Sequence, residues 1–404
     1  MRRWMRVLVS GLVAAACVTL LAPLGTATSS AVTSQPQVVG ASTAVTLFVG
    51  QTSTSTKSVL ISSMEEFMYE ISDPSPTLLA AVAAFYQNGG GESVVVSTPD
   101  EQPATLAAAV DAVPSSTPAS LFVVPSLGNR AGTGYDTIVD SLAALADRSV
   151  GMAILDPPGV LVHAMQAGDD ISPLMDLGLH LMRRVVPGDQ TRRIVLYSSR
   201  FVADDNHPLD VAEGTLISVA ALMAGAYAAN DITFGVWNSP AGPNTPLQLG
   251  TTTPDEAGTL TNTQIGQLVT QGGIDTIVSS ADGATTPQGG RTLATFTPDY
   301  AYISSVRTAD YIQRSLTAGL AGSVFSPSVA AQQQQIDAEA TSFLTDLWTN
   351  GGLAGYSASD AFQVNSTTTT QDVAAGHIRV QVLVSLFHPA DFTEIDIVLD
   401  AAKP

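Results

Sequence analysis

Residues Phe85–Val96 read FYQNGGGESVVV, where three glycines separate an apolar segment from a run of valines. The segment before the glycines is apolar at helical spacing and follows Pro76, which predicts a helix over Thr77–Gln87. The valines Val94–Val96 predict a buried strand. A phosphate-binding loop needs the opposite order, strand then glycines then helix, so that helix N–H groups face the anion. The glycines are therefore expected to end the helix in a left-handed cap, without binding a nucleotide.

Segments of strand and helix character alternate on both sides of this corner. Strands are predicted at short β-branched or apolar runs: Thr43–Gly50, Val59–Ile61, Leu121–Val124, Met152–Leu155, Ile194–Tyr197 and Ile274–Val278. Helices are predicted from Ser63, which has capping-box spacing to Glu66, and over Leu106–Val113, Thr137–Ala146 and Leu174–Met182. Leu216–Ala229 is too short to cross a bilayer and predicts a buried helix. This alternation predicts an α/β fold with a largely parallel sheet.

After about Pro240 the composition of the sequence changes, and proline, threonine, glycine and asparagine become frequent. Further short runs at Thr292–Phe296, His377–Leu386 and Phe392–Leu399 predict strands, and Gln332–Asn350 predicts a long helix. We therefore expect an α/β domain over residues 43–290 and a smaller α+β C-terminal domain over residues 291–404. Residues 32–42 form a short linker before the first domain.

The chain of 404 residues is strongly acidic, with a net charge of −20. Its 45% hydrophobic and 13% charged content is typical of a globular protein. Lys57 and Lys403 are its only lysines. Sequence-independent nucleic-acid binding and docking on an anionic membrane are not expected, because both need a basic surface.

Residues 1–31 have the layout of a secretory signal, in which three arginines precede a long apolar run that ends in small residues. The run is long enough to be an uncleaved membrane anchor, although Pro23 and the small residues after it favour cleavage. A start site chosen too far upstream is a third alternative. Cys17 is the only cysteine, so neither an intramolecular disulfide nor a cysteine metal site is expected.

No motif predicts a catalytic or ligand site. The G-x-S-x-G elbow is absent, and no nearby motif gives a serine or carboxylate partner to any of the five histidines: His163, His180, His207, His377 and His388. Asp204–Asp210 offers oxygen ligands to a hard cation but is more typical of a polar turn, and Gly128–Asp136 predicts a flexible loop. Arg183-Arg184 and Arg192-Arg193 are expected in surface ion pairs. We expect no catalytic residue, no cofactor and no metal.

Several segments, in order along residues 38–404, resemble the tail sheath protein of contractile phage tails and related contractile injection systems. The first two are STAVTLFVGQT and LLAAVAAFYQNGGGESVVVS. They are followed by AILDPPG with GAYAANDITFGVWNSPAG, by GGIDTIV, and by GGRTLATFTPDYAYISSVRTADYIQRSL. The last two are ATSFLTDLWTNGGLAGYSASDAFQV and AAGHIRVQVLVSLFHPADFTEIDIVL.

The resemblance implies an α/β domain, sometimes described as subtilisin-like, followed by a C-terminal sheath domain. The catalytic motifs of subtilisin are absent from this sequence, so the analogy of fold implies no enzymatic activity. The implied role is structural. Subunits form a helical sleeve around an inner tube, are held extended on a baseplate, and contract to drive the tube through a target envelope. The expected partners are other copies of the chain, the tube protein and the baseplate.

In this family, terminal arms add strands to the sheets of neighbouring subunits. The alternating, β-branched segment TEIDIVL near the end of the chain is the expected arm, and its partner-binding residues are Thr393, Glu394, Ile395, Asp396, Ile397, Val398 and Leu399. An ordinary intramolecular edge strand is the alternative.

The beginning of the chain departs from the family pattern. Family members usually carry an extended N-terminal arm before the first core strand, where this chain has its signal-like segment. Sheaths of this family assemble in the bacterial cytoplasm, so the segment raises export or membrane tethering as a second possibility. The alternative function is therefore an exported α/β protein that uses the sheath fold for surface binding or hydrolysis.

Overall fold

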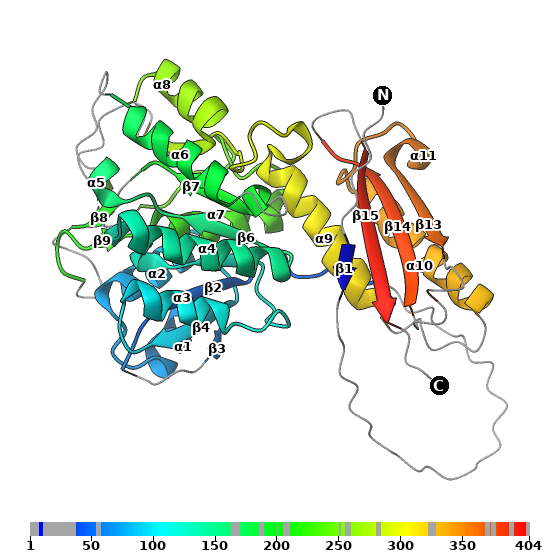
Figure 1. The fold of residues 1–404 in the computed structure, drawn as a ribbon, viewed down its shortest axis with the longest axis horizontal. Helices are drawn as coiled ribbons and strands as arrows, with labels where there is room; N and C mark the ends of the chain where they lie inside the picture. The colour runs from blue at the N-terminus through cyan, green and yellow to red at the C-terminus, as the bar shows by residue number, and fades with distance from the viewer. Residues whose placement is uncertain are drawn as a thin grey trace, which may run out of the picture. The chain divides into compact units, whose positions relative to one another are not determined.

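The structure is a computed structural model. It describes residues 8–10, 38–53, 58–162, 170–185, 190–199, 201–204, 211–249, 252–254, 260–279, 284–321, 329–367, 372, 377–387 and 392–400. The chain divides into two compact units. We call Ser42–Asp310 the α/β unit, and Met1–Ala41 together with Tyr311–Pro404 the terminal unit (Figure 1).

An eight-stranded sheet forms the centre of the α/β unit, in the order β12-β11-β7-β6-β5-β2-β4-β3. Its strands are β2 Thr46–Gln51, β3 Ser58–Ile61, β4 Ser93–Thr98, β5 Leu121–Val123, β6 Met152–Leu155, β7 Ile194–Tyr197, β11 Ile274–Ser279 and β12 Thr285–Gln288. All pairings from β11 to β4 are parallel, and only β12 and β3, at the two edges, pair antiparallel. The predicted α/β fold with a largely parallel sheet is confirmed.

Helices cover both faces of this sheet. They are α1 Met64–Glu70, α2 Pro76–Gln87, α3 Pro103–Asp111, α4 Gly132–Arg148, α5 Gly159–Val162, α6 Ser172–Arg184, α7 Val219–Phe234 and α8 Asn262–Gln267. Short helical turns lie at η1 Pro125–Asn129, η2 Gln190–Arg193, η3 Leu268–Gly272 and η4 Pro298–Tyr300. A small sheet, β10-β8-β9, is built from Thr252–Pro254, Phe201–Ala203 and Leu216–Ile217.

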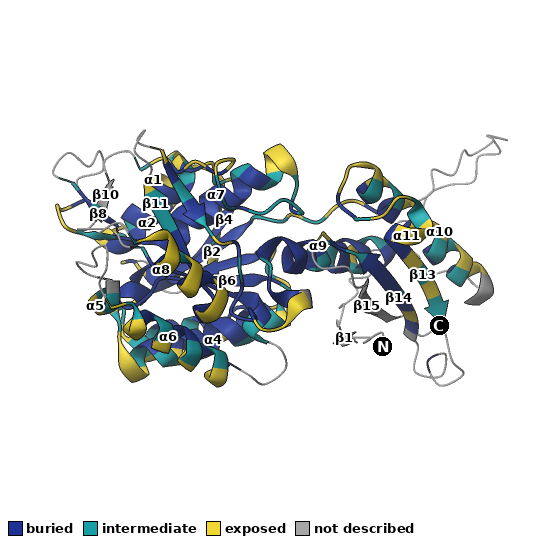
Figure 2. Ribbon diagram, turned by 90° about the horizontal axis from the view of Figure 1, so that it is seen from above, coloured by how far each residue is buried: buried dark blue, intermediate teal, exposed yellow. Residues whose placement is uncertain are grey.

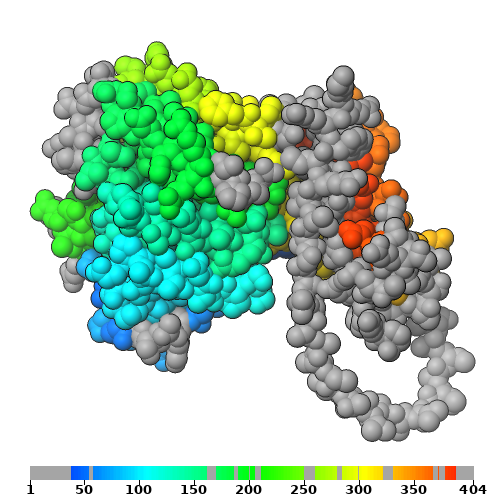
Figure 3. Space-filling model, viewed as in Figure 1, coloured from blue at the N-terminus to red at the C-terminus, as the bar shows by residue number. Residues whose placement is uncertain are grey.

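Successive residues of β2 show how the core is divided between the two faces. Leu47 and Val49 belong to one buried cluster with residues of α3, α4 and α6. Phe48 points to the opposite face, where its ring packs against Phe85 of α2 with centroids 5.3 Å apart. Strand side chains alternate between faces, so a strand covered on both sides is apolar throughout. In Figure 2 the strands β2 and β6 are accordingly dark blue, and in Figure 3 the helices α3, α4 and α6, coloured cyan to green, face the viewer.

The glycine-rich corner has the predicted form. Helix α2 ends at Gln87, Gly89 has φ +91°, and β4 begins at Ser93. The side chain of Asn88 adds an interaction that the sequence does not indicate. Its Nδ2 donates to the Gln248 carbonyl at 3.0 Å, and the Gln248 N–H donates to Asn88 Oδ1 at 2.8 Å. The corner is therefore fixed to a segment 160 residues further along the chain.

The predicted buried helix is α7. Eleven of its residues are buried, from Val219 to Asn230. Within the described part of the chain, no helix combines the length and apolar character needed to cross a membrane. Residues 1–31 lie outside the described residues except for Leu8–Ser10, which form strand β1.

Two local predictions are wrong. Thr292–Phe296 forms turns instead of a strand, because the Thr292 hydroxyl donates to the Tyr300 carbonyl at 2.6 Å and accepts from the Ala294 N–H at 3.1 Å. Gly128–Asp136 is not a flexible loop. It contains the end of the buried turn η1 and the first residues of α4.

The terminal unit combines helices with a four-stranded sheet. Its helices are α10 Val329–Thr349, α11 Ala358–Ala361 and the end of α9, which spans Ile303–Leu320. The sheet has the order β1-β15-β14-β13, with β1 Leu8–Ser10, β13 Phe362–Thr367, β14 His377–Ser385 and β15 Phe392–Asp400.

The sequence places a domain boundary near residue 290, whereas the compact units divide between Asp310 and Tyr311, inside α9. Residues just after 290 pack in the α/β unit. Leu293 belongs to its buried core, and the Leu293 N–H donates to the Ile194 carbonyl at 2.9 Å.

Candidate subunit interface

Both ends of the described chain meet in the sheet of the terminal unit. Strand β15 contains all seven residues of the predicted arm and lies between β14 and β1. Its inner edge pairs antiparallel with β14 over its whole length, from Phe392 opposite Ser385 to Asp400 opposite His377. The arm is thus part of an intramolecular sheet in the single chain, and its binding to a partner stays a prediction.

The outer edge of β15 is covered over a much shorter length. Strand β1 pairs parallel with it at three positions, where Leu8, Val9 and Ser10 lie opposite Asp396, Ile397 and Val398. No other described strand pairs with this edge. An edge with free N–H and C=O groups is a template for another strand.

Helix α10 gives the sheet a buried face and so fixes its register. It packs against β13 and β14, and its buried residues include Ile336, Ala340 and Leu344. Along β14, Ile378 and Val380 are buried, whereas Arg379 between them is exposed. A shift by one residue would turn this apolar set outward, so burial specifies the pairing of β14 with its neighbours.

Polar contacts also fix β13 and β14. The Ser366 hydroxyl of β13 donates to Asp337 Oδ2 of α10 at 3.0 Å. Arg379 Nε of β14 donates to Asp372 Oδ1 at 2.9 Å.

The arginines of the α/β unit differ from the sequence-based expectation. Arg184 forms the expected exposed ion pair, with distances of 2.9 and 2.7 Å from its Nε and Nη2 to the Asp140 carboxylate. The prediction is wrong for Arg193, which is 2% exposed and lies 2.7 Å from Asp310 Oδ2 and 3.3 Å from Asp147 Oδ1. A buried guanidinium needs such partners, because removing an isolated charge from water is costly.

Arg307 forms a second buried ion pair. Its guanidinium contacts both oxygens of Asp231, at 2.9 and 2.6 Å, and donates to the Thr43 carbonyl at 2.9 Å. It also lies 4.8 Å from the centre of the Tyr227 ring. Through these contacts, the start of α9 is fixed to the end of α7 and to the segment that precedes β2.

One histidine has a carboxylate partner that the sequence did not predict. His180 Nε2 lies 3.0 Å from Asp136 Oδ1, across two helices whose pairing no local motif indicates. His377 begins β14. The remaining histidines, His163, His207 and His388, lie outside the described residues, and so does Asp204–Asp210 apart from Asp204.

Two buried carboxyls in the α/β unit have raised pKa values. Burial raises the pKa of Asp156 to about 6, against the hydrogen bonds from the Ser218 hydroxyl at 2.6 Å and the Ala220 N–H at 2.9 Å. Burial also raises the pKa of Asp275 well above its usual range, although the Arg291 N–H donates to it. Asp156 follows β6 and accepts at the first turn of α7, so its role there is to satisfy helix N–H groups.

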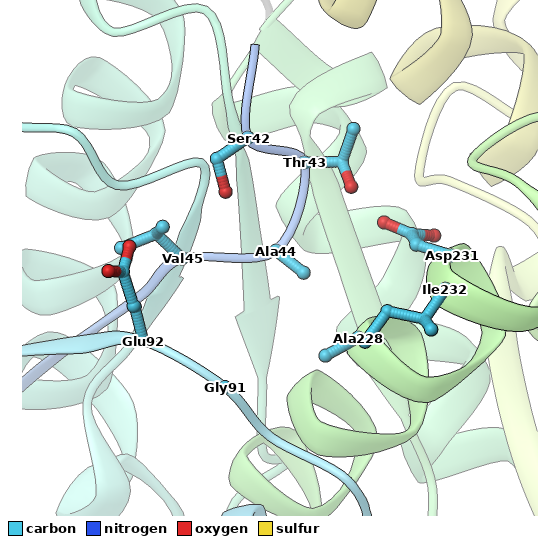
Figure 4. A pocket seen from close by; sticks show the side chains of 9 residues that line it. All are labelled: Ser42, Thr43, Ala44, Val45, Gly91, Glu92, Ala228, Asp231 and Ile232. Atoms are coloured by element: carbon cyan, nitrogen blue, oxygen red, sulfur yellow. The ribbon is translucent and has the colours of Figure 1, made fainter. Parts of the chain in front are cut away.

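Two hollows on the α/β unit offer few polar or charged side chains that could bind a ligand. One, of about 220 Å³, lies between the segment before β2, Gly91-Glu92 and the end of α7 (Figure 4). Its Asp231 is already paired with Arg307. A second, of about 510 Å³, lies beside α3, and half of the residues that line it are alanines. In the described parts of the chain, no group of three or more His, Cys, Asp or Glu residues could hold a metal ion.

Sequence comparison with protein families and with curated proteins finds no match. Comparison with solved structures finds several. The sheath complex of an extracellular contractile injection system (PVC) in its contracted state is similar with TM-score 0.68 and 23% identity, over 96% of this chain and 99% of that one. The helical sheath of the anti-feeding prophage (AFP), also contracted, has TM-score 0.68 and 22% identity over 95% and 100% of the two chains. A sheath tail protein from Desulfitobacterium hafniense has TM-score 0.58 and 10% identity over 91% and 98%. The chain has the fold of these sheath proteins.

Proposed function

We propose that this chain is a structural subunit of a contractile sheath, which polymerises helically around an inner tube and contracts to drive that tube through a target envelope. The observation that carries the proposal is likeness along the whole chain. The PVC and AFP sheath chains are covered over 99% and 100% of their length, so the terminal unit is matched together with the α/β unit.

The arrangement of the terminal sheet supports self-assembly. A contact between different surfaces of identical subunits that does not close into a ring generates a helix. Strand addition joins such subunits through main-chain hydrogen bonds while allowing the rest of each subunit to move as a rigid body. We assign this contact to Thr393–Leu399 of β15.

An enzymatic role has less support. The buried carboxyl of Asp156 accepts hydrogen bonds at the first turn of α7. Within the described part of the chain, no serine or cysteine is hydrogen-bonded to the His180–Asp136 pair. A cytoplasmic assembly site, a tube protein and a baseplate as partners follow from the same proposal. Similarity to a protein of the AFP baseplate, with TM-score 0.63, favours a machine that has such a base.

Electron microscopy tests the proposal directly. Residues 32–404 would be purified and imaged in negative stain over a range of concentrations. We expect striated tubes that sediment at high speed. Protein that is folded by circular dichroism but stays monomeric at every concentration would refute self-assembly and leave the exported binding or hydrolytic protein as the better account.

A further inference from the structure

Strand β1 is formed by residues that the sequence marks as part of a leader. Leu8–Ser10 lie in the apolar run after the N-terminal arginines, where a secretory signal would be recognised and removed. In the structure the same residues belong to the terminal unit and pair with the centre of β15. The segment therefore has a place in the folded subunit.

The position of β1 is the one that an incoming strand would need. The inner edge of β15 is fully used by β14, so its outer edge is the only one that can accept a further strand. β1 occupies Asp396–Val398, near the middle of that edge, and a second strand cannot pair with the same N–H and C=O groups at the same time. Occupation by β1 and occupation by another copy exclude each other.

We propose that β1 is an intramolecular cap, which covers the outer edge of β15 in the free subunit and must leave before a second copy of this chain can pair there. This proposal rests on the proposed function in one respect: it takes a second copy of the chain as the competitor of β1. Deletion of residues 1–31 removes β1 and should therefore open this edge and permit assembly.

The covalent connection of β1 to the rest of the chain explains why so short a strand can act as a cap. Residues 11–37 connect β1 to the described body of the chain at Val38. A tethered segment of this kind acts at an effective concentration of about 1 mM, whereas a free subunit competes at its own concentration, on the order of 1 μM. The cap pairs at only three positions and in parallel, the less stable arrangement per residue, so it can be displaced once subunits are abundant.

A proline substitution in the full chain tests the cap without truncation. Val9→Pro removes an N–H and fixes φ near −65°, which disfavours a strand at the centre of β1. Val18→Pro places the same substitution in the same apolar run but outside β1, and is the matched control. Val9→Thr keeps the N–H and the β-branched shape, and should behave like the wild type.

The first readout is hydrogen exchange of the β15 amides at concentrations where all proteins are monomeric. We expect faster exchange in Val9→Pro than in the wild type, Val18→Pro and Val9→Thr at those amides of Asp396–Val398 that point towards β1. The β15 amides that point towards β14, and the amides of β14 itself, should be unchanged. Equal exchange in Val9→Pro and the wild type would overturn the cap. This readout does not require that the chain form tubes.

The second readout is the concentration at which assembly begins, measured by light scattering and electron microscopy. We expect Val9→Pro to assemble at a concentration at least about tenfold lower than the wild type or Val18→Pro, because the tethered competitor is gone. A higher onset in Val9→Pro would show that β1 promotes assembly, and would also overturn the cap. If no protein assembles while exchange responds as expected, the proposed function fails and the cap stands.

Discussion

Gly89 has a backbone conformation and a neighbour that both exclude a side chain. Its φ is +91°, and a Cβ built on it would lie 2.8 Å from the Cβ of Ala229 in α7. Valine is β-branched and poorly tolerated at positive φ. We therefore expect Gly89→Val to lower the free energy of unfolding by about 2–4 kcal/mol, measured by urea denaturation. Gly91→Val is the matched control, since nothing lies within 4 Å of its Cβ. Equal stability of the two variants would contradict this account of the corner.

Asp156 makes stability depend on pH in a direction opposite to that of most carboxyls. Its pKa is raised from 3.8 to about 6 by burial, so the folded state binds this proton more tightly than the unfolded state does. The contribution of the protonated carboxyl is fully present below about pH 4 and is lost as the pH rises through 6. A shift of this size corresponds to roughly 2–3 kcal/mol.

The neutral variant Asp156→Asn isolates this effect. We expect the free energy of unfolding of the wild type, relative to Asp156→Asn, to fall between pH 4.5 and pH 7.5. The exposed Asp111→Asn serves as the control for general charge effects. A wild-type stability that runs parallel to that of Asp156→Asn across this range would show that the pKa of Asp156 is not raised.

At the scale of elements, β15 is the strand on which the partner prediction depends. Deletion of Phe392–Pro404 removes every backbone group that the arm offers to a neighbour. We expect this variant to form no tubes while the α/β unit keeps its helical circular dichroism, because none of the deleted residues belongs to that unit. Deletion of residues 401–404 alone leaves β15 intact and should not affect assembly. Tubes formed by the longer deletion would remove the arm assignment.

Elements defined by local patterns were predictable from the sequence, whereas contacts made over long separations were not. Strand β7 was predicted at Ile194–Tyr197, because a short apolar run needs no distant information. The burial of Arg193, one residue earlier, depends on Asp310, 117 residues away. The turn at Thr292 likewise depends on a side-chain hydrogen bond that outweighs strand propensity.

At the candidate interface, too, the strand itself was predictable from the sequence but its long-range pairing was not. The alternation of TEIDIVL predicted a strand, and β15 has this strand at Phe392–Asp400. Its pairing with Leu8–Ser10 could not be predicted, because periodicity says nothing about which distant segment lies beside an edge. The leader-like composition of that segment favoured a different role altogether.

At the scale of the whole molecule, the net charge of −20 opposes the approach of identical subunits. The proposed assembly must therefore be stabilised by apolar burial and main-chain pairing, which do not weaken with salt. Salt shortens the distance over which the surface charges repel, from about 10 Å at 0.1 M ionic strength to about 3 Å at 1 M. We expect the concentration needed for tube formation by residues 32–404 to fall as sodium chloride is raised over this range, as measured by sedimentation. An onset concentration that rises with salt would instead show that complementary charges hold the subunits together. Pairing at β15 would then not be the main contribution to assembly.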